Sequence, residues 1–191
     1  SSVKRTLARQ ELLRPKSKWK RVRPHTERPK ALAPGDLVQI DTVHFIDWQT
    51  KERFYIYTLI DVYSRTAYAE VHPLLRQTMS LAVALRAQQA MGFAFGTVQA
   101  DNGPEFQRYF HDMLSAKGIA LRHSRVRQSN DNAHIERFNR TIQDECLGKY
   151  PTQDTATQAK IDAFLRYYNT ERKHLGIGLK RPSDLLAQVA E

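Results

Sequence analysis

The chain has 191 residues, of which 41% are hydrophobic, and this size and composition are typical of a globular protein with its own core. A single cysteine, Cys146, excludes a disulfide framework and any zinc site that needs two thiolates, and no apolar run is long enough for a membrane span. The formal net charge of +10 is concentrated in residues 1–30, which hold eleven Lys and Arg against two Glu and therefore indicate a polyanionic partner such as nucleic acid.

The first 34 residues form a segment distinct from the rest. They contain four prolines and little hydrophobic periodicity, which predicts a basic linker or arm with at most a short helix between Ser2 and Leu13. A solvated tail that only aids solubility is the alternative. Because the sequence starts without Met and shows no signal peptide, we expect a piece of a longer intracellular protein.

From residue 36 onward the pattern alternates between strands and helices. Alternating or β-branched runs predict strands at 37–41, 54–61, 66–71, 97–100 and 119–123, and helical periodicity predicts helices at 77–91, 106–117, 133–147, 155–169 and 183–189. Three consecutive strands favour an antiparallel meander, and the later alternation of helix and strand favours parallel additions. The sequence therefore predicts an α/β fold with one mixed five-stranded sheet flanked by helices.

Three acidic residues fall where such a fold forms ligand sites. Asp41 closes the first predicted strand, Asp101 directly follows the fourth, and Glu136 lies on the helix at 133–147. Like charges brought together raise each other's pKa, and a divalent cation removes that cost. Oxygen ligands without His or Cys favour Mg²⁺ or Mn²⁺. Each acid taken alone could equally be a turn, capping or solvated residue.

The helix at 133–147 has two distinguishable faces. Its apolar residues recur with helical spacing and predict a buried stripe: Ile135, Phe138, Ile142 and Cys146. The polar residues Glu136, Asn139, Arg140 and Gln143 fall together on the flank of that stripe. Glu136 should therefore lie at the edge of the core, where a cleft can form.

Several segments together resemble the catalytic core of retroviral integrases and DDE-type bacterial insertion-sequence transposases. The resemblance covers roughly residues 34–186 and is carried, in the family's order, by Asp41-Thr-Val, Leu59-Ile-Asp-Val-Tyr-Ser-Arg65, Ala100-Asp-Asn-Gly-Pro-Glu-Phe106, Asn130-Asp-Asn-Ala-His-Ile-Glu-Arg-Phe-Asn-Arg-Thr141, Tyr167-Tyr-Asn-Thr-Glu-Arg-Lys-His174 and Arg181-Pro-Ser183. Two departures are visible. Thirty-four residues separate Asp101 from Glu136, one fewer than is usual in the integrases, and Ala133 stands where retroviral integrases carry glycine.

The resemblance implies a ribonuclease H-like fold and a metal-dependent transposase or integrase. Asp41, Asp101 and Glu136 would be both the catalytic residues and the ligands of two Mg²⁺ ions, for which Mn²⁺ can substitute. Such an enzyme cleaves element ends and joins their 3′-hydroxyl to target DNA. Its partners would be double-stranded DNA and further copies of itself, with no membrane, in the cytoplasm and associated with the nucleoid when acting.

The remaining expectations concern DNA contacts and domain limits. The candidates for DNA contact are Asn132, Asn139, Arg140 and Gln143 near the catalytic helix and Lys18, Lys20, Arg21 and Arg23 in the arm. We expect an arm at 1–34, a catalytic core at 35–150 and a helical extension at 151–191. Arg172, Lys173 and His174 could bind phosphate or pack the tail.

Three other functions stay open at this stage. A ribonuclease H-like nuclease that only hydrolyses nucleic acid would use the same acids, and a non-catalytic DNA-binding descendant of a transposase would be expected to have lost one. A generic basic nucleic-acid binder would leave the acidic residues and the near-neutral body unexplained.

Overall fold

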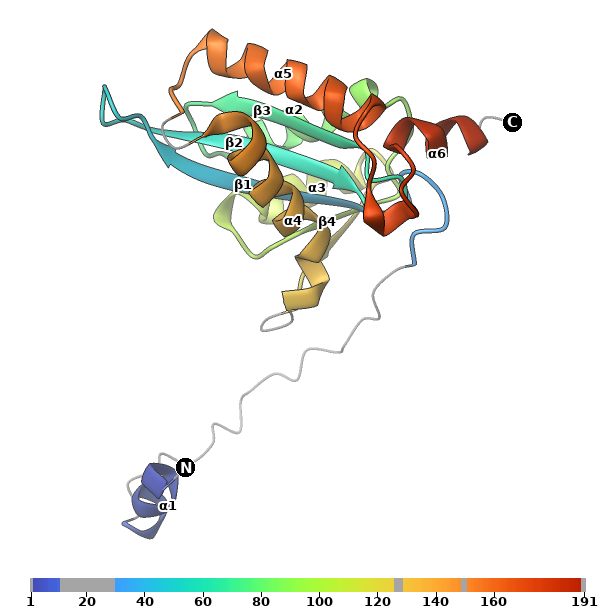
Figure 1. Ribbon diagram of the computed structural model, residues 1–191. Coiled ribbons are helices and arrows are strands. Elements are labelled where there is room, and N and C mark those ends of the chain that lie inside the picture. The colour runs from blue at the N-terminus through green and yellow to red at the C-terminus, as the bar shows by residue number, and fades with distance from the viewer. Residues whose placement is uncertain (1, 11–29, 126–128, 149–150, 190–191) are drawn as a thin grey trace.

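The computed structural model describes residues 2–10, 30–125, 129–148 and 151–189. Within them, one five-stranded sheet has the order β3-β2-β1-β4-β5 (Figure 1). The strands are β1 (Val38–Ile46), β2 (Arg53–Asp61), β3 (Ala67–His72), β4 (Thr97–Ala100) and β5 (Ala120–His123). β1, β2 and β3 pair antiparallel, whereas β1 with β4 and β4 with β5 pair parallel. The predicted mixed sheet and its antiparallel meander are confirmed.

Helices cover both faces of this sheet. In chain order the helical elements are α1 (Ser2–Arg9), α2 (Gln77–Met91), the short turn η1 (Pro104–Phe106), α3 (Arg108–Ser115), η2 (Ser129–Asn132), α4 (Ala133–Ile142), the π-helical turn η3 (Gln143–Leu147), α5 (Thr155–Thr170), η4 (Leu175–Ile177) and α6 (Pro182–Val189). α4 and α5 lie on one face of the sheet, and α2 and α3 lie on the other (Figure 1).

The sequence of β2 explains how the sheet packs against both layers. Successive side chains of a strand point to opposite faces. Phe54 and Ile56 accordingly pack into the core beneath α4 and α5, while Tyr57 and Leu59 pack into the core beneath α2 and α3. All four are fully buried, which is why the strand reads as a continuous apolar run.

α5 shares its core with α4. Ile161 and Phe164 of α5 belong to the same buried cluster as Ile135 and Phe138 of α4. The predicted apolar stripe of α4 is thus confirmed, and the segment after residue 151 packs onto the same face of the sheet. The domain limits themselves stay predictions.

The structure differs from the predicted elements in three places. β1 continues to Ile46 because all nine of its residues pair with β2, so Asp41 lies within the strand and not at its end. The predicted helix at 106–117 is split into η1, which has Pro104 in its first turn, and α3. The helix at 133–147 changes to a π-helical turn at Gln143.

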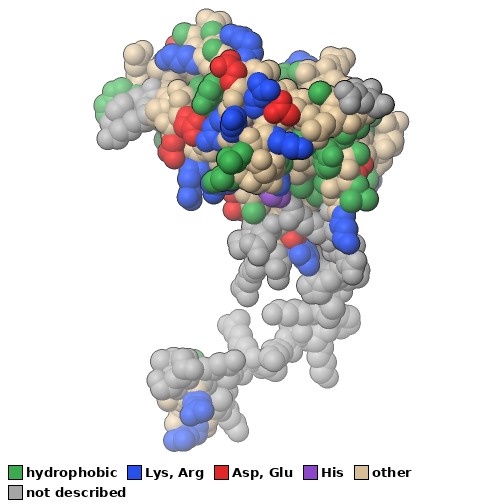
Figure 2. Space-filling view, turned by 45° about the vertical axis from the view of Figure 1, so that its right-hand side comes forward, with side chains coloured by type: hydrophobic (Ala, Val, Ile, Leu, Met, Phe, Trp, Pro, Cys, Tyr) green, Lys and Arg blue, Asp and Glu red, His purple; other side chains and the backbone are tan. Residues whose placement is uncertain are grey.

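Two surface properties complete the description. Figure 2 shows Lys and Arg side chains scattered over the visible face of the body with Asp and Glu side chains between them. Of the helices in the described residues, none is both long and apolar enough to cross a membrane.

Candidate functional site

Asp41 lies on the central strand β1 and is held from two sides. Its Oδ1 accepts a hydrogen bond from the backbone N–H of Thr42 at 2.8 Å, and its Oδ2 accepts one from Nδ2 of Asn139 on α4, also at 2.8 Å. The buried Asn139 in turn accepts a hydrogen bond through Oδ1 from the hydroxyl of Thr58 on β2 at 2.7 Å. The orientation of the Asp41 carboxylate is therefore fixed by three elements.

Burial, the largest cause, and the negative charges of Asp101 and Glu105 together raise the pKa of Asp41 from 3.8 to about 6, against the opposing hydrogen bonds from Thr42 and Asn139. The charge of Asp41 is thus destabilised both by lost solvation and by neighbouring carboxylates. A divalent cation bound to hard oxygen ligands would remove this penalty.

Asp101 and Glu105 approach each other around Gly103. Asp101 directly follows β4, and its Oδ1 accepts a hydrogen bond from the N–H of Gly103 at 2.7 Å. A Cβ atom at Gly103 would lie 2.5 Å from Oε2 of Glu105 and 2.9 Å from Oδ1 of Asp101, so any other residue would force at least one of these carboxylates to shift.

Glu105 is a functional candidate that sequence reasoning missed. It is only 7% exposed, and its Oε2 has no hydrogen-bond partner among the described residues. A buried unpaired carboxylate oxygen is costly, and such atoms mark strained or ligand-binding positions. The signal in the sequence was its place four residues after Asp101, but nothing in the pattern predicted that it would be buried.

Glu136 lies on the exposed flank of α4, as predicted. It lines a shallow cavity of about 370 Å³ together with Asn139, Arg140, Gln143 and Asp144. It precedes Asn139, which holds Asp41, by one helical turn. Among the described residues, however, no three acidic, His or Cys side chains are arranged to share one metal ion. The charges of Asp101 and Glu105 act on Asp41, which places these two acids near it.

The predicted DNA-contact residues near α4 are not equivalent. Asn132 accepts a hydrogen bond from Gln99 at 2.7 Å, Gln143 donates one to the carbonyl of Asn139 at 2.8 Å, and Asn139 is buried against Asp41. Arg140 is exposed and has no hydrogen bond or ion pair from its side chain within the part of the chain that the structure describes. The arm candidates Lys18, Lys20, Arg21 and Arg23 lie outside the described residues.

A buried polar network fixes the beginning of α4 against the sheet. The amides of Gln39 on β1 and Gln99 on β4 both donate to the carbonyl oxygen of Asp131 at 2.6 Å. Oε1 of Gln39 accepts from the N–H of Ile135 at 2.9 Å. The Asp131 carboxylate pairs with Arg122 and Arg125 at 3.3 and 2.8 Å, and these pairs lower its pKa. The one sign of this network in the sequence is the presence of Gln39 and Gln99 inside buried strands.

Asp61 and His174, which lie outside the site, have structural roles. Asp61 is buried and accepts hydrogen bonds from the N–H groups of Gly35 and Ser64 at 3.0 and 2.7 Å. His174 is buried, packs edge-on against Tyr168 and lies 3.2 Å from the carbonyl oxygen of that residue through Nε2. Its ring therefore packs the tail, one of the two roles left open.

Curated relatives are mobile-element and viral proteins. The chain is 28% identical over 167 residues to an uncharacterized 31.7 kDa protein of insertion element IS407 from Burkholderia multivorans, covering 85% of this chain and 60% of the relative. It is 30% identical over 183 residues to an uncharacterized 39.2 kDa protein of insertion element IS476 from Xanthomonas euvesicatoria, covering 92% of this chain and 52% of the relative. The chain thus spans little more than half the length of these relatives.

Solved structures show the same fold. The catalytic core domain of HTLV-2 integrase, solved in complex with magnesium, superposes with a TM-score of 0.66 at 18% identity over 82% of this chain and 99% of that one. The catalytic core domain of BIV integrase superposes with a TM-score of 0.64 at 21% identity over 82% and 97%. The expected ribonuclease H-like architecture is confirmed by these neighbours.

Two family models, both described as integrase core domain, match residues 31–129 and residues 117–182. Together they span the sheet, both aspartates of the site and the whole of α4. The chain belongs to the integrase core domain family and carries a catalytic core of the DDE integrase and transposase type.

Proposed function

We propose that the chain is the catalytic part of a metal-dependent transposase or integrase that cleaves the ends of a DNA element and joins the freed 3′-hydroxyl to target DNA. The observation that carries this proposal is the approach of Asp41 on β1 and Asp101 directly after the neighbouring strand β4, with Asp41 held by Asn139 of α4. A buried carboxylate whose pKa is raised by burial and by neighbouring acids is typical of catalytic sites.

The residues present fit hard divalent cations. Three features favour added positive charge: the raised pKa of Asp41, the unpaired buried oxygen of Glu105, and the close approach of the Asp101 and Glu105 carboxylates around Gly103. We infer that Asp41, Asp101 and Glu136 would hold two Mg²⁺ ions, with Mn²⁺ as a substitute. When bound, such ions stabilise the charge that develops during in-line displacement at a phosphodiester.

The chain's own groups orient the reaction. In the first step water attacks the phosphorus at an element end, and the 3′-oxygen of the neighbouring nucleotide leaves as a hydroxyl. In the second step that 3′-hydroxyl attacks a phosphodiester of the target, and the target's own 3′-oxygen leaves. Thr42 and Asn139 keep Asp41 in one orientation throughout, and the exposed guanidinium of Arg140 beside Glu136 is placed to contact a phosphate.

Partners and location follow from the same proposal. The substrates would be double-stranded DNA at element ends and target, and joining two ends requires at least two active sites held together, so we expect a homo-oligomer acting at the bacterial nucleoid. The basic arm, with Lys18, Lys20, Arg21 and Arg23, would add sequence-independent affinity.

A branched oligonucleotide that mimics a strand-transfer product tests this function without knowledge of the element ends. The chain is incubated with it in Mg²⁺ or Mn²⁺ beside the variants Asp101→Asn and Glu136→Gln. We expect metal-dependent resealing that both variants lose while still binding DNA. Hydrolysis without joining would favour the nuclease alternative, and DNA binding without any chemistry would favour the non-catalytic one.

A further inference from the structure

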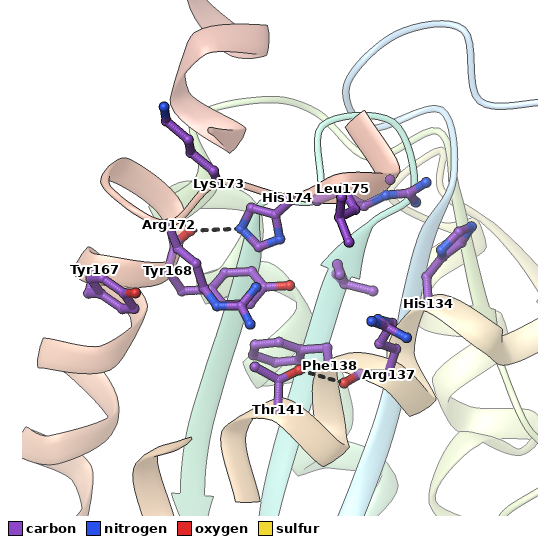
Figure 3. Close-up of a pocket in the computed structure, with 13 residues that line it drawn as sticks. His134, Arg137, Phe138, Thr141, Tyr167, Tyr168, Arg172, Lys173, His174 and Leu175 are labelled. Carbon is purple, nitrogen blue, oxygen red and sulfur yellow. Dashed lines mark hydrogen bonds between the residues drawn. The ribbon is translucent and has the colours of Figure 1, made fainter. Parts of the chain in front are cut away.

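A second cavity, of about 650 Å³, lies on the other flank of α4 (Figure 3). It is enclosed by α4, by the end of α5 and by the segment from Arg172 to Gly176, with Arg65 from the turn after β2. The α4 residues that line it include His134, Arg137 and Thr141. At about 100° per residue, these are rotated from Glu136 by about 100° to 160° around the helix axis.

The lining of this cavity is strongly cationic. It contains Arg65, Arg137, Arg172 and Lys173 and no Asp or Glu. Arg172 is partly neutralised by Glu145, to which it donates at 2.7 and 3.2 Å. Arg137 is exposed, and its side chain has no ion pair within the described ranges. Lys173 extends away from the other lining side chains in Figure 3, so the arginines set the charge of the interior.

A buried tyrosine presents its hydroxyl to these arginines. Tyr168 is only 5% exposed, and its ring is packed against Phe138, Phe164 and His174. Its hydroxyl points into the cavity and has no hydrogen-bond partner in the described part of the chain (Figure 3). Burial raises the pKa of Tyr168 to about 12, so the hydroxyl keeps its proton at neutral pH and is an available donor.

The same three arginines act on one point. Burial raises the pKa of the Tyr168 hydroxyl most, the positive charges of Arg172, Arg65 and Arg137 lower it, and the negative charge of Glu145, the ion-pair partner of Arg172, raises it. Three arginines thus surround an unused hydroxyl donor with one carboxylate beside them, and this excess of positive charge favours the binding of an oxyanion.

A third cavity, of about 720 Å³, links this one to the catalytic flank. It shares Arg137 and Arg172 with the cavity around Tyr168 and shares Glu136 and Arg140 with the catalytic flank, and the acidic residues Asp144 and Glu145 also line it. An extended polyanion bound near Glu136 can therefore continue across the helix to Tyr168. A small free anion would occupy only one of these adjoining cavities.

We propose that the cavity around Tyr168, Arg137 and Arg172 binds a backbone phosphate of the DNA whose scissile end lies at the catalytic flank of α4. This rests on the proposed function. Tyrosine and arginine are common donors to DNA phosphates, and such contacts fix the register of a protein on its DNA without reading the sequence. The site would hold the DNA at a fixed distance from the aspartates.

The test measures DNA affinity in EDTA, where chemistry cannot interfere. A labelled blunt duplex is titrated with the full chain and its variants at salt concentrations between about 50 and 200 mM. Arg137→Gln is expected to bind about 5-fold more weakly and to reduce the slope of log affinity against log salt by about 0.9, the value for one lost phosphate contact. Tyr168→Phe, which removes only an unpartnered hydroxyl, should bind about 3-fold more weakly with an unchanged melting temperature.

Matched controls come from the opposite face of the sheet. Arg108→Gln and Tyr109→Phe on α3 remove the same groups from exposed positions and should leave affinity and slope unchanged. If Arg137→Gln and Tyr168→Phe bind DNA like the unaltered chain, the proposal is wrong. If the two variants bind DNA normally but inorganic phosphate no longer raises their melting temperature, the cavity holds a free anion. If they bind DNA normally but polyglutamate no longer binds to them, the cavity holds an acidic protein segment. Either result overturns DNA binding there.

Failure of the proposed function gives a different pattern. A chain that binds DNA through Arg137 but never joins strands would refute the function and retain the phosphate site. If Arg137→Gln and Tyr168→Phe join strands as well as the unaltered chain does, the proposed function is supported and the phosphate site is refuted.

Discussion

Asn139 on α4 donates a hydrogen bond of 2.8 Å to Asp41 on β1, across 98 residues of sequence. The oxygen of the same Asn139 amide accepts a hydrogen bond from the hydroxyl of Thr58 on β2. One buried side chain therefore joins a helix and two strands at the carboxylate that the proposed chemistry needs. Asn139 was a candidate for DNA contact, and the geometry favours its use in holding Asp41.

Asn139→Ala should therefore lower metal-dependent strand joining about 10- to 100-fold, the usual effect of removing a group that orients a metal ligand. The loss arises because Asp41 keeps only the hydrogen bond from Thr42. Strand-joining rates at several Mg²⁺ concentrations measure it. Gln89→Ala, at an exposed position of α2 on the opposite face of the sheet, is the control, and equal rates for the two variants would contradict the assignment.

Gly103→Ala should impair the site directly. The new Cβ would lie 2.5 Å from Glu105 and 2.9 Å from Asp101, so at least one carboxylate must move. We expect joining to fall at least about 10-fold, since displacements of about 1 Å at a reacting centre have large effects. Gly96→Ala, where a Cβ would meet only ordinary contacts of 3.7 Å or more, should behave like the unaltered chain. A fully active Gly103→Ala would show that the close approach has no functional role.

Glu105→Gln should stabilise the metal-free protein by about 1 kcal/mol while weakening its response to Mg²⁺. The substitution removes a negative charge that raises the pKa of Asp41 and supplies an amide donor beside Asp101. Thermal melts with and without MgCl₂ measure both effects. A lower melting temperature without metal would mean that the Glu105 carboxylate is needed for the fold.

Asp131→Ala should cost about 3–5 kcal/mol of unfolding free energy. Asp131 is 1% exposed and pairs with Arg122, whose guanidinium would be left buried without its partner. Urea unfolding gives the change. Asp112→Ala, which breaks an exposed pair with Arg108 at 3.7 Å, should cost less than about 0.5 kcal/mol, and a similar loss in both variants would argue against the buried anchor.

Stability should also fall at acid pH through Glu70. Burial would raise the pKa of Glu70, but hydrogen bonds from His72, Arg86 and Tyr68 outweigh it and lower the pKa from 4.5 to about 2. Because the pKa is lower in the folded state, the stabilisation is complete above pH 4.5 and disappears as the pH falls through about 2. Melting temperatures across this range measure it. Glu70→Gln should show a shallower decline, and an identical profile would refute the role of Glu70.

Much of the fold could be predicted because its signals are local. Alternating or β-branched runs predicted all five strands, and helical spacing predicted which face of α4 is buried. The order of the family motifs identified Asp41, Asp101 and Glu136 as the candidate catalytic acids. Their catalytic role stays a prediction.

The parts that could not be predicted depend on long-range packing. No local pattern shows that Glu105 is buried with an unpaired oxygen, that Gln39 and Gln99 converge on Asp131, or that Tyr168 directs its hydroxyl into a cationic cavity. Each is set by which face meets which neighbour after strands distant in sequence have paired. The length of β1 was missed for the same reason, since its pairing with β2 carries it to Ile46.

The polar network at the start of α4 has a consequence for the order of events during synthesis. Asp41 and Asp101 leave the ribosome well before residues 131–139, which supply the carbonyl that Gln39 and Gln99 bind and the amide that orients Asp41. A nascent or truncated chain that lacks this stretch carries both aspartates without the side chain that aims them. The proposed catalytic centre is thus completed only after residues 131–139 have been synthesised, well after both aspartates.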